Sequence, residues 1–417
     1  MHIAIDLHDI LNVGGLEKVV TGVAVEMAIR GHTVTAFTHS PTSSHASFKS
    51  PDNLTLQFYT FSGDSRTIPE IQNMLCRINP DVFISPSSFN NVILWAAALQ
   101  GTDVPLLYSE HSNPWRIEEE RWDKAERQAV LWAADSVHLL TESYLEAVPP
   151  LLRAKCRIIG NPISQASHQP SETPHPPCLL SLGRFAKLKQ IPLLVQTFAL
   201  LAPDFPPWEL HIWGAGEEEK SIRKAIAEAH CPQIYLHGLT LQPEQQFAQA
   251  DIFCIPSRFE GFPIAVLEAF SQAIPVVGFA DCSGVNSLVH SGYNGLLAES
   301  MTVESLATCL RQLMSSYETR QRMGKAARIT AQKYAPEYIY DQWEQLLQIA
   351  ASRKGNTQLS RLYQDELLSP EEETWRNTMR EILRRPNVLL QNRQIFRRFL
   401  RRHPSLKNII KKVIRKC

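Results

Sequence analysis

Short apolar runs alternate with amphipathic segments of helical period along most of the chain. In the first half, the expected strands are residues 3–7, 33–38, 56–61, 82–85, 106–109 and 137–140, with a first helix at about 16–30. Strands that alternate with helices of this length are typical of parallel sheets joined by crossover helices. The pattern therefore predicts an α/β fold.

A proline-rich segment, residues 164–177 (SQASHQPSETPHPP), interrupts this alternation and has little that could pack in a core. After it the expected strands are 178–183, 210–213, 234–236, 252–255 and 276–279, and helices follow over about 302–349. We therefore expect two doubly wound, Rossmann-like domains, 1–163 and 178–334, joined by the linker 164–177. In such sheets ligands bind at the carboxyl ends of the strands, so two facing domains would enclose one cleft.

Beyond the second domain we expect a helix over 335–352 that packs back towards the first domain, and then a basic amphipathic tail, 353–417. The formal net charge of the chain is zero, but the residues from Trp375 onward hold many Arg and Lys and a single acid, Glu381. The remaining body is therefore acidic, and the charge asymmetry marks the tail as a separate feature.

The composition, 44% hydrophobic and 20% charged, is typical of a globular protein. The N-terminus reads as a first strand rather than a secretory leader. The most apolar stretch, residues 262–279, is interrupted by prolines and polar residues, so it does not read as a membrane span. Eight cysteines without a CxxC pair or zinc-ligand spacing indicate a reduced compartment. We expect a cytoplasmic protein.

The segment from Pro256 to Phe270 carries the strongest chemical signal. A strand ends before it, Glu260-Gly261-Phe262 forms a loop, and Pro263 suits the first turn of a new helix. Backbone N–H groups at such a helix start can bind anionic oxygens. Glu268 lies among apolar residues of this helix, where a carboxylate is costly without a partner. It either accepts hydrogen bonds from ligand hydroxyls or forms an ion pair with Arg or Lys.

Two cations follow the first strand after the linker. Arg184 and Lys189 flank a short loop, where a guanidinium and an ammonium can together hold a diphosphate. Two cations in a loop are more often a solvated surface. Their place after a strand, in the same half of the chain as Glu268, favours the binding role.

Two glycine-rich turns also join a strand to a helix. Gly14-Gly15 follows the first strand, and Gly214-Ala215-Gly216 follows residues 210–213. Glycines there let the backbone approach a phosphate or sugar closely. Each pair is weak evidence alone. The second turn is interpreted as the lining of a base pocket.

Taken together, these motifs resemble the retaining glycosyltransferases of family four, which have the GT-B fold. The matches run in the family's order over about residues 1–345. They are Gly14-Gly15-Leu16-Glu17-Lys18-Val19, Tyr108-Ser109-Glu110-His111-Ser112, Gly160-Asn161-Pro162-Ile163, Gly183-Arg184 with Lys189, Gly214-Ala215-Gly216, Glu260-x7-Glu268 and Asn294-Gly295-Leu296-Leu297. The Glu-x7-Glu element is the most specific. The first two motifs are similar to the branch that builds bacterial surface polysaccharide and lipopolysaccharide.

The resemblance implies roles for these residues. Arg184 and Lys189 would hold the donor diphosphate and stabilise the leaving group. Glu268 would bind the nucleotide ribose, and Glu260 would lie near the transferred sugar. Gly15 would pack against the donor from the opposite domain. His111 would face the reacting carbon, although a histidine there can also be an ordinary polar strand end.

The resemblance also implies that neither a metal nor another cofactor is needed, because basic side chains and helix N-termini neutralise the departing diphosphate. No Asp-x-Asp element occurs in the sequence. Front-face attack through an ion pair is the mechanism usually proposed for the family. Two positions differ from the family's pattern: Gln190 replaces a common Gly, and Asn286 replaces a common Glu.

The basic tail lies beyond the resemblance. From Arg380 to Lys416 its Arg and Lys are mixed with apolar residues at helical spacing, interrupted at Pro386 and Pro404. We expect it to dock on an anionic membrane surface, which would bring the site to a lipid-linked acceptor. Packing on the acidic body and contact with nucleic acid are the alternatives, the last the least favoured.

The sequence thus predicts a transferase that moves a hexose or N-acetylhexosamine from a nucleotide sugar, UDP-linked, to a surface glycan or its lipid-linked precursor. A nucleotide-sugar epimerase of the same fold and a catalytically silent sugar-binding protein are the two rival hypotheses.

Overall fold

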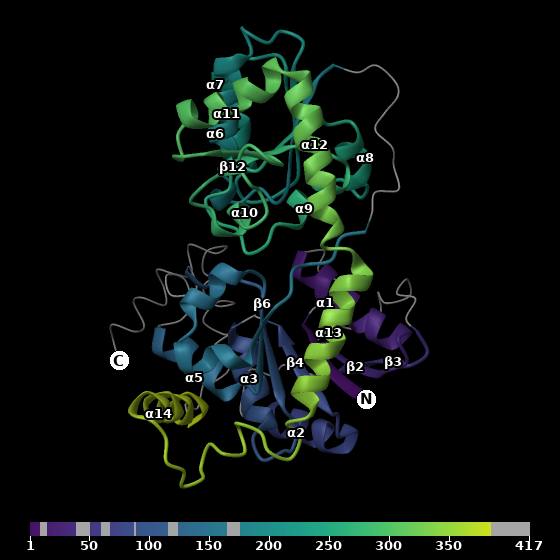
Figure 1. Ribbon diagram of the computed structural model, residues 1–417, viewed down its shortest axis with the longest axis vertical. Helices are drawn as coiled ribbons and strands as arrows, with labels where there is room; N and C mark the ends of the chain where they lie inside the picture. The colour runs from purple at the N-terminus through teal and green to yellow at the C-terminus, as the bar shows by residue number, and fades with distance from the viewer. Residues whose placement is uncertain are drawn as a thin grey trace, which may run out of the picture.

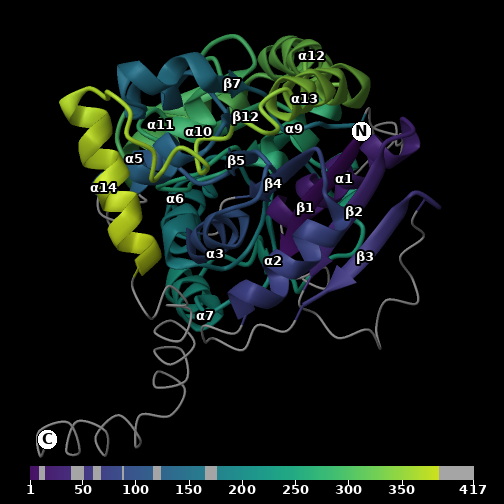
Figure 2. The same cartoon turned by 90° about the horizontal axis from the view of Figure 1, so that it is seen from below.

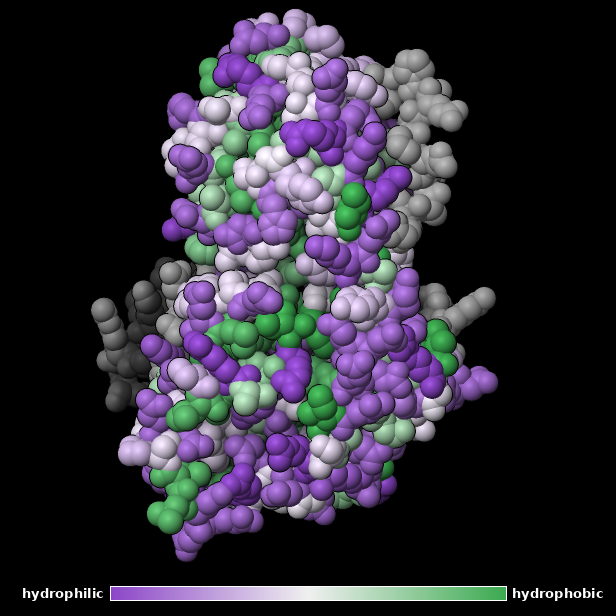
Figure 3. Space-filling model, in the orientation of Figure 1, coloured by the Kyte–Doolittle hydropathy of each residue, from purple (hydrophilic) through white to green (hydrophobic). Residues whose placement is uncertain are grey.

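The computed structural model describes residues 1–8, 15–38, 51–59, 67–86, 89–115, 124–164 and 176–384. Gly14, most of the linker and the chain beyond Arg384 lie outside these ranges. The described residues form two lobes stacked along the long axis of the molecule (Figure 1). In the space-filling view the lobes meet at a narrow waist (Figure 3).

The N-terminal lobe is built on one parallel sheet of seven strands. Its strand order is β3-β2-β1-β4-β5-β6-β7, and every pairing is parallel. The strands are β1 (His2–His8), β2 (Thr33–Thr38), β3 (Leu54–Phe58), β4 (Val82–Pro86), β5 (Leu106–Glu110), β6 (Ser136–Leu139) and β7 (Cys156–Ile158). The helices are α1 (Gly15–Ile29), α2 (Thr67–Ile78), α3 (Phe89–Leu99) and α5 (Lys124–Ala133), with short 3₁₀ turns at Glu142–Ala147 and Pro150–Lys155.

The C-terminal lobe repeats this plan with six strands in the order β10-β9-β8-β11-β12-β13, again all parallel. The strands are β8 (Cys178–Leu182), β9 (Glu209–Trp213), β10 (Ile234–Leu236), β11 (Ile252–Cys254), β12 (Val276–Phe279) and β13 (Gly295–Ala298). The helices are α6 (Ile191–Leu201), α7 (Glu219–Ala229), α8 (Pro243–Ala248), α9 (Ile264–Ser271), α10 (Ser283–Asn286), α11 (Val303–Ser315) and α12 (Tyr317–Gln332), with a 3₁₀ turn at Lys187–Lys189.

These two sheets confirm the predicted pair of Rossmann-like domains. In each sheet the order of successive strands changes direction beside the first strand of the domain, β1 or β8, as it does in doubly wound sheets. The strands are buried on both faces, so their residues read as apolar runs rather than as an alternation. Two short strands were not predicted: β7, of three residues, and β13, whose Gly295 begins a strand of four.

The chain crosses back to the N-terminal domain after α12. Helix α13 (Pro336–Ala351) leaves the junction of the lobes and runs along the N-terminal domain beside α1 (Figure 1). Its apolar face, including Trp343, Leu346 and Leu347, is buried in one core with strand β1 and helix α1. The two domains are therefore connected twice, by the linker and by the α12–α13 junction.

The charge pattern places residues 353–384 in the basic tail, but these residues pack on the N-terminal domain. Helix α14 (Pro370–Arg384) lies against α5 (Figure 2) and buries Trp375, Met379 and Ile382. Apolar burial therefore fixes this segment as part of the folded body, and its first turn is acidic rather than basic. A separate tail begins no earlier than residue 385, outside the described residues.

None of the helices that the structure describes combines the length and apolar character that crossing a bilayer requires.

Candidate functional site

A cavity of about 310 Å³ lies between the two domains, at the carboxyl ends of both sheets. The residues that line it include Gly15, Leu16, His111, Leu140 and Asn161 from the N-terminal domain, and Leu182, Gly183, Lys189, Glu260, Gly261, Phe262, Pro263 and Ile264 from the C-terminal domain. Most of the predicted site residues are therefore brought to one place.

Lys189 and Glu260 form the charged centre of this cavity. The Lys189 Nζ donates to Glu260 Oε1 over 2.5 Å, and both side chains are largely buried. Lys189 ends the 3₁₀ turn after β8, and Glu260 precedes α9. A partly buried ammonium with a carboxylate beside it can hold an anionic group and a sugar hydroxyl side by side.

The loop of Glu260 to Pro263 is held against the N-terminal domain by three side chains. Asn113 Nδ2 donates to the Glu260 carbonyl over 3.3 Å, and Tyr144 OH donates to the Gly261 carbonyl over 2.6 Å. Asn161 Nδ2 donates to the Phe262 carbonyl over 3.3 Å. Pro263 lies just before the first helical residue of α9 rather than in its first turn.

Gly261 lets the two domains approach closely. A Cβ at this position would lie 2.4 Å from the carbonyl oxygen of His111, far inside van der Waals contact. Gly15 lies opposite, at the start of α1, where a Cβ would meet the Ile264 side chain at 3.3 Å. The backbones of the two lobes therefore approach closely at Gly261 and His111, beside the cavity.

Glu268 does not line this cavity among the described residues. Its Oε1 accepts from Lys18 Nζ over 3.2 Å, across the junction between the domains. Of the two roles considered for the Glu268 carboxylate, the structure therefore contains the ion pair with a lysine. Glu268 lies on α9, whose first residues line the cavity, and its side chain is 14% exposed.

Arg184 is not among the residues that line the cavity. Its side chain is 72% exposed and donates to Glu217 over 3.2 Å, whereas the preceding Gly183 lines the cavity. Of the two cations predicted to act together, Lys189 lines the cavity and Arg184 does not.

The second glycine turn packs beneath the Arg184 loop. A Cβ at Gly214 would lie 1.9 Å from the Gly183 carbonyl oxygen, and one at Gly216 would lie 2.3 Å from the Phe185 carbonyl oxygen. These glycines therefore set the position of the loop after β8. The first glycine of the other pair, Gly14, lies outside the described residues.

His111 is partly buried at the cavity and belongs to a hydrogen-bonded chain that the sequence did not reveal. Its Nε2 lies 2.7 Å from Ser109 Oγ, which lies 2.7 Å from His138 Nδ1. Burial, with His138 as a further cause, holds the pKa of His111 well below its ordinary value. Burial also lowers the pKa of His138 to about 4. Both rings are therefore neutral at pH 7.

The sequence holds one indication of this series of hydrogen bonds, which is that its two middle members occupy equivalent positions on neighbouring strands. Ser109 and His138 are paired residues in the parallel register of β5 and β6, each one residue before the end of its strand. The order of strands in the sheet is needed to see this.

The two positions that differ from the family's pattern have distinct local roles. Gln190 adopts a left-handed conformation, with φ +48°, which explains why glycine suits this position. Asn286 ends the short helix α10 and donates to the Ala280 carbonyl over 2.6 Å.

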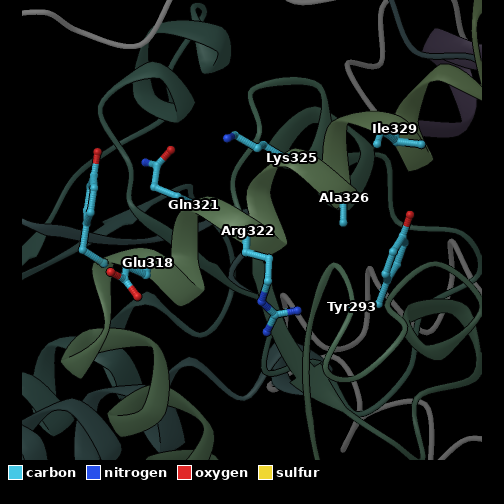
Figure 4. Close-up of a pocket in the computed structure, with 8 residues that line it drawn as sticks. Tyr293, Glu318, Gln321, Arg322, Lys325, Ala326 and Ile329 are labelled. Atoms are coloured by element: carbon cyan, nitrogen blue, oxygen red, sulfur yellow. The ribbon is translucent and has the colours of Figure 1, made fainter.

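Another hollow, of about 550 Å³, lies along α12, and Tyr293 and Tyr317 are among the residues that line it (Figure 4). Arg322 and Lys325 line it, but none of the predicted site residues does. No group of three or more His, Cys, Asp or Glu side chains in the described ranges is arranged to hold a metal ion.

Comparisons with known proteins agree with this architecture. The family model for group 1 glycosyl transferases matches residues 164–330, and the model for glycosyltransferase family 4 matches residues 13–166. An uncharacterized glycosyltransferase of Haemophilus influenzae is 30% identical over 171 residues, 40% of this chain and 48% of that protein. The poly(glycerol-phosphate) alpha-glucosyltransferase of Bacillus subtilis is 31% identical over 179 residues, 42% of this chain and 26% of that protein. The aligned parts span about half or less of these relatives.

Solved structures share the fold over more of the chain. HepE of Anabaena, determined with UDP and glucose, superposes with a TM-score of 0.69 at 16% identity, covering 84% of this chain and 99% of that one. The lipopolysaccharide outer core galactosyltransferase WaaB superposes with a TM-score of 0.65 at 18% identity, covering 83% and 99%. The two family models together span residues 13–330, one for each of the two facing domains. The chain therefore belongs to the GT-B glycosyltransferases of family four.

Proposed function

We propose that this protein is a retaining glycosyltransferase that moves a hexose or N-acetylhexosamine from a UDP-linked sugar to a surface glycan or its lipid-linked precursor. The observation that carries the proposal is the pairing of Lys189 with Glu260 in the interdomain cavity, below the start of α9. A cation and a helix N-terminus at one point suit a diphosphate, and the adjacent carboxylate suits a sugar hydroxyl.

Lys189 is the group that would neutralise the departing diphosphate. Charge on the leaving group grows as the glycosidic bond breaks, and a fixed ammonium in a shielded cavity stabilises that charge without reorganisation. The N–H groups at the start of α9 act in the same direction. We propose that these groups suffice without a metal, so that transfer persists in excess EDTA.

Glu268 would bind the nucleotide ribose once its carboxylate is released from Lys18. Glu260 would orient the transferred sugar, and His111 would contact that sugar from the N-terminal domain. Arg184 would reach the diphosphate only by leaving Glu217, a move that its high exposure permits. Retention follows from attack on the same face as the departing diphosphate.

Names of similar proteins support the choice of donor and acceptor. HepE was solved with UDP-glucose, and relatives in the comparisons include glucosyl- and N-acetylglucosaminyltransferases of poly(glycerol-phosphate) and poly(ribitol-phosphate). Both relatives are named for the transfer of a sugar to a polymer, which supports a polymeric acceptor for this protein.

The test is a transfer assay with a panel of UDP-sugars, with and without a lipid-linked glycan acceptor. The proposal predicts UDP release that depends on the acceptor and falls at least tenfold in Lys189→Ala. The matched control is Lys187→Ala, an exposed lysine of the same turn. Interconversion of UDP-sugars without acceptor would instead identify an epimerase, and binding without turnover would identify a silent binding protein.

We further propose that residues 385–417 hold the protein on the inner face of the cell membrane. The support is their clustered Arg and Lys with interleaved apolar residues, each nearby cation contributing about 1 kcal/mol on an anionic surface. Deleting residues 385–417 leaves all of α14 in place and should abolish sedimentation with phosphatidylglycerol vesicles. Unchanged sedimentation would contradict this proposal.

A further inference from the structure

A chain of four polar groups, whose two middle members are buried, leads from the backbone to the cavity. It begins at the carbonyl oxygen of Ile159, which lies 2.7 Å from His138 Nε2. From His138 Nδ1 the chain continues through Ser109 Oγ to His111 Nε2, each step 2.7 Å long. Ser109 and His138 are 1% exposed, so water does not compete for these contacts.

The direction of every hydrogen bond in this chain follows from its first member. A carbonyl oxygen can only accept, so His138 Nε2 carries a hydrogen and donates it. A neutral imidazole has one N–H, which leaves His138 Nδ1 as an acceptor. The Ser109 hydroxyl therefore donates its single hydrogen to His138.

The remaining step fixes His111. Because the Ser109 hydrogen is already used, Ser109 Oγ can only accept from His111 Nε2, which must then carry the hydrogen of that ring. The other nitrogen, Nδ1, is left with a lone pair. The backbone carbonyl of Ile159 thus sets the tautomer of a histidine two side chains away.

We propose that Ser109 and His138 are positioning residues that hold His111 in the tautomer with hydrogen on Nε2. In this state Nδ1 can accept a hydrogen bond but cannot donate one. Any group that bonds to Nδ1, whether of the protein or of a substrate, must therefore be a donor, such as a sugar hydroxyl, and not a phosphate oxygen. Only this last step, the identity of the ligand, rests on the proposed function.

Helix α13 supports the chain from the other side. The Trp343 ring packs on the His138 ring with centroids 4.4 Å apart, and Trp343 is buried. The helix that crosses back from the C-terminal domain therefore fixes the orientation of His138. The tautomer of His111 therefore depends on the position of α13.

The experiment is ¹⁵N NMR of the histidine-labelled full chain at pH 7, with His111 assigned from a His111→Gln sample. We expect wild type to show His111 as the neutral ring with hydrogen on Nε2. In Ser109→Ala the partner of Nε2 is lost, and in His138→Leu the Ser109 hydrogen is free to donate to Nε2. Both variants should therefore shift His111 towards the opposite tautomer.

His138→Asn is the conservative variant, because its side-chain oxygen can replace Nδ1 as the acceptor for Ser109. It should keep the wild-type tautomer. In the transfer assay, Ser109→Ala and His138→Leu should lower kcat by about 10- to 100-fold, by analogy with the loss found when hydrogen-bond partners of metal-ligating histidines are removed, with the KM for donor changed little. His138→Asn should recover most of kcat.

Either of two results would overturn the inference: hydrogen on Nδ1 of His111 in the wild type, or the same tautomer in wild type, Ser109→Ala and His138→Leu. If a variant fails to fold, the wild-type spectrum alone decides. A protein without transferase activity but with the expected tautomers would refute the proposed function and leave the positioning role intact.

Discussion

Lys18 of the N-terminal domain donates to Glu268 of the C-terminal domain over 3.2 Å, so one ion pair bridges the two lobes. The Lys18 side chain is 66% exposed and that of Glu268 is 14% exposed. An exposed lysine contributes little to stability in such a pair, typically less than about 1 kcal/mol. A ligand can therefore replace Lys18 as the partner of Glu268 with little loss of stabilising free energy.

The first prediction concerns the role of Glu268. In Glu268→Gln, the affinity for a UDP-sugar should fall about tenfold or more, because a hydrogen bond to a charged acceptor contributes roughly 1.5–3 kcal/mol. In Lys18→Gln the affinity should not fall. Calorimetric titration measures both, with Glu304→Gln, an exposed carboxylate on α11, as the control. If Glu268→Gln bound the UDP-sugar as tightly as Glu304→Gln does, Glu268 would have no role in donor binding.

The second prediction concerns the contact between the lobes at Gly261. Gly261→Ala places a Cβ against the His111 carbonyl and should force the lobes apart, with a stability loss of about 1–3 kcal/mol and at least tenfold lower transfer. Gly238→Ala is the control, since a Cβ there meets nothing within 4 Å. Denaturant unfolding and the transfer assay together report the outcome. Equal behaviour of the two alanine variants would refute the close approach.

The third prediction concerns the backbone at Gln190. Its φ of +48° is unfavourable for a residue with a Cβ by roughly 1–2 kcal/mol, and Gln190→Gly removes that cost. Because glycine also gains freedom in the unfolded chain, we expect a net stabilisation of about 0.5–1 kcal/mol. Gln242→Gly, at an exposed position with φ −128°, should destabilise instead. Thermal unfolding of the pair is the measurement, and a loss of stability in Gln190→Gly would contradict the account.

The fourth prediction concerns acid stability. Burial lowers the pKa of His138 from 6.5 to about 4, so between these values the unfolded chain binds a proton that the folded chain does not. The free energy of unfolding should therefore fall as the pH drops from 6.5 towards 4, by up to roughly 3 kcal/mol from this residue. Above pH 6.5 the contribution is fully present.

Urea unfolding of wild type and His138→Asn at pH 7, 6 and 5 measures this slope. His138→Asn should lose part of the pH dependence, because asparagine does not titrate. If the free energy of unfolding fell equally with pH in the two proteins, His138 would not be the source of the pH dependence.

The fold could be predicted from the sequence because the evidence for it is local. Apolar runs such as residues 276–279 match an observed strand, and the break at residues 164–177 separates two complete sheets. Strand β7 was missed because three residues carry too little pattern. Helix α14 was assigned to the tail because the Arg-rich stretch of the sequence begins within it, whereas burial of Trp375 and Met379 decides its packing.

For the candidate site, the sequence could predict only which residues follow the end of a strand. Lys189, Glu260 and His111 follow strands, and the structure brings all three to one cavity. The direction of Arg184 and the partner of Glu268 depend on contacts between distant segments. The Ser109–His138 pair depends on the order of β5 and β6 in the sheet, which a single sequence does not state.

The central claim is that Lys189, in the cavity between the domains, binds the diphosphate of a nucleotide sugar. Calorimetric titration of UDP into wild type, Lys189→Ala and Lys187→Ala tests it most directly, because binding needs neither the acceptor nor turnover. We expect UDP to bind wild type and Lys187→Ala with similar affinity and Lys189→Ala at least tenfold more weakly. Equal binding of UDP to the two lysine variants would contradict the claim.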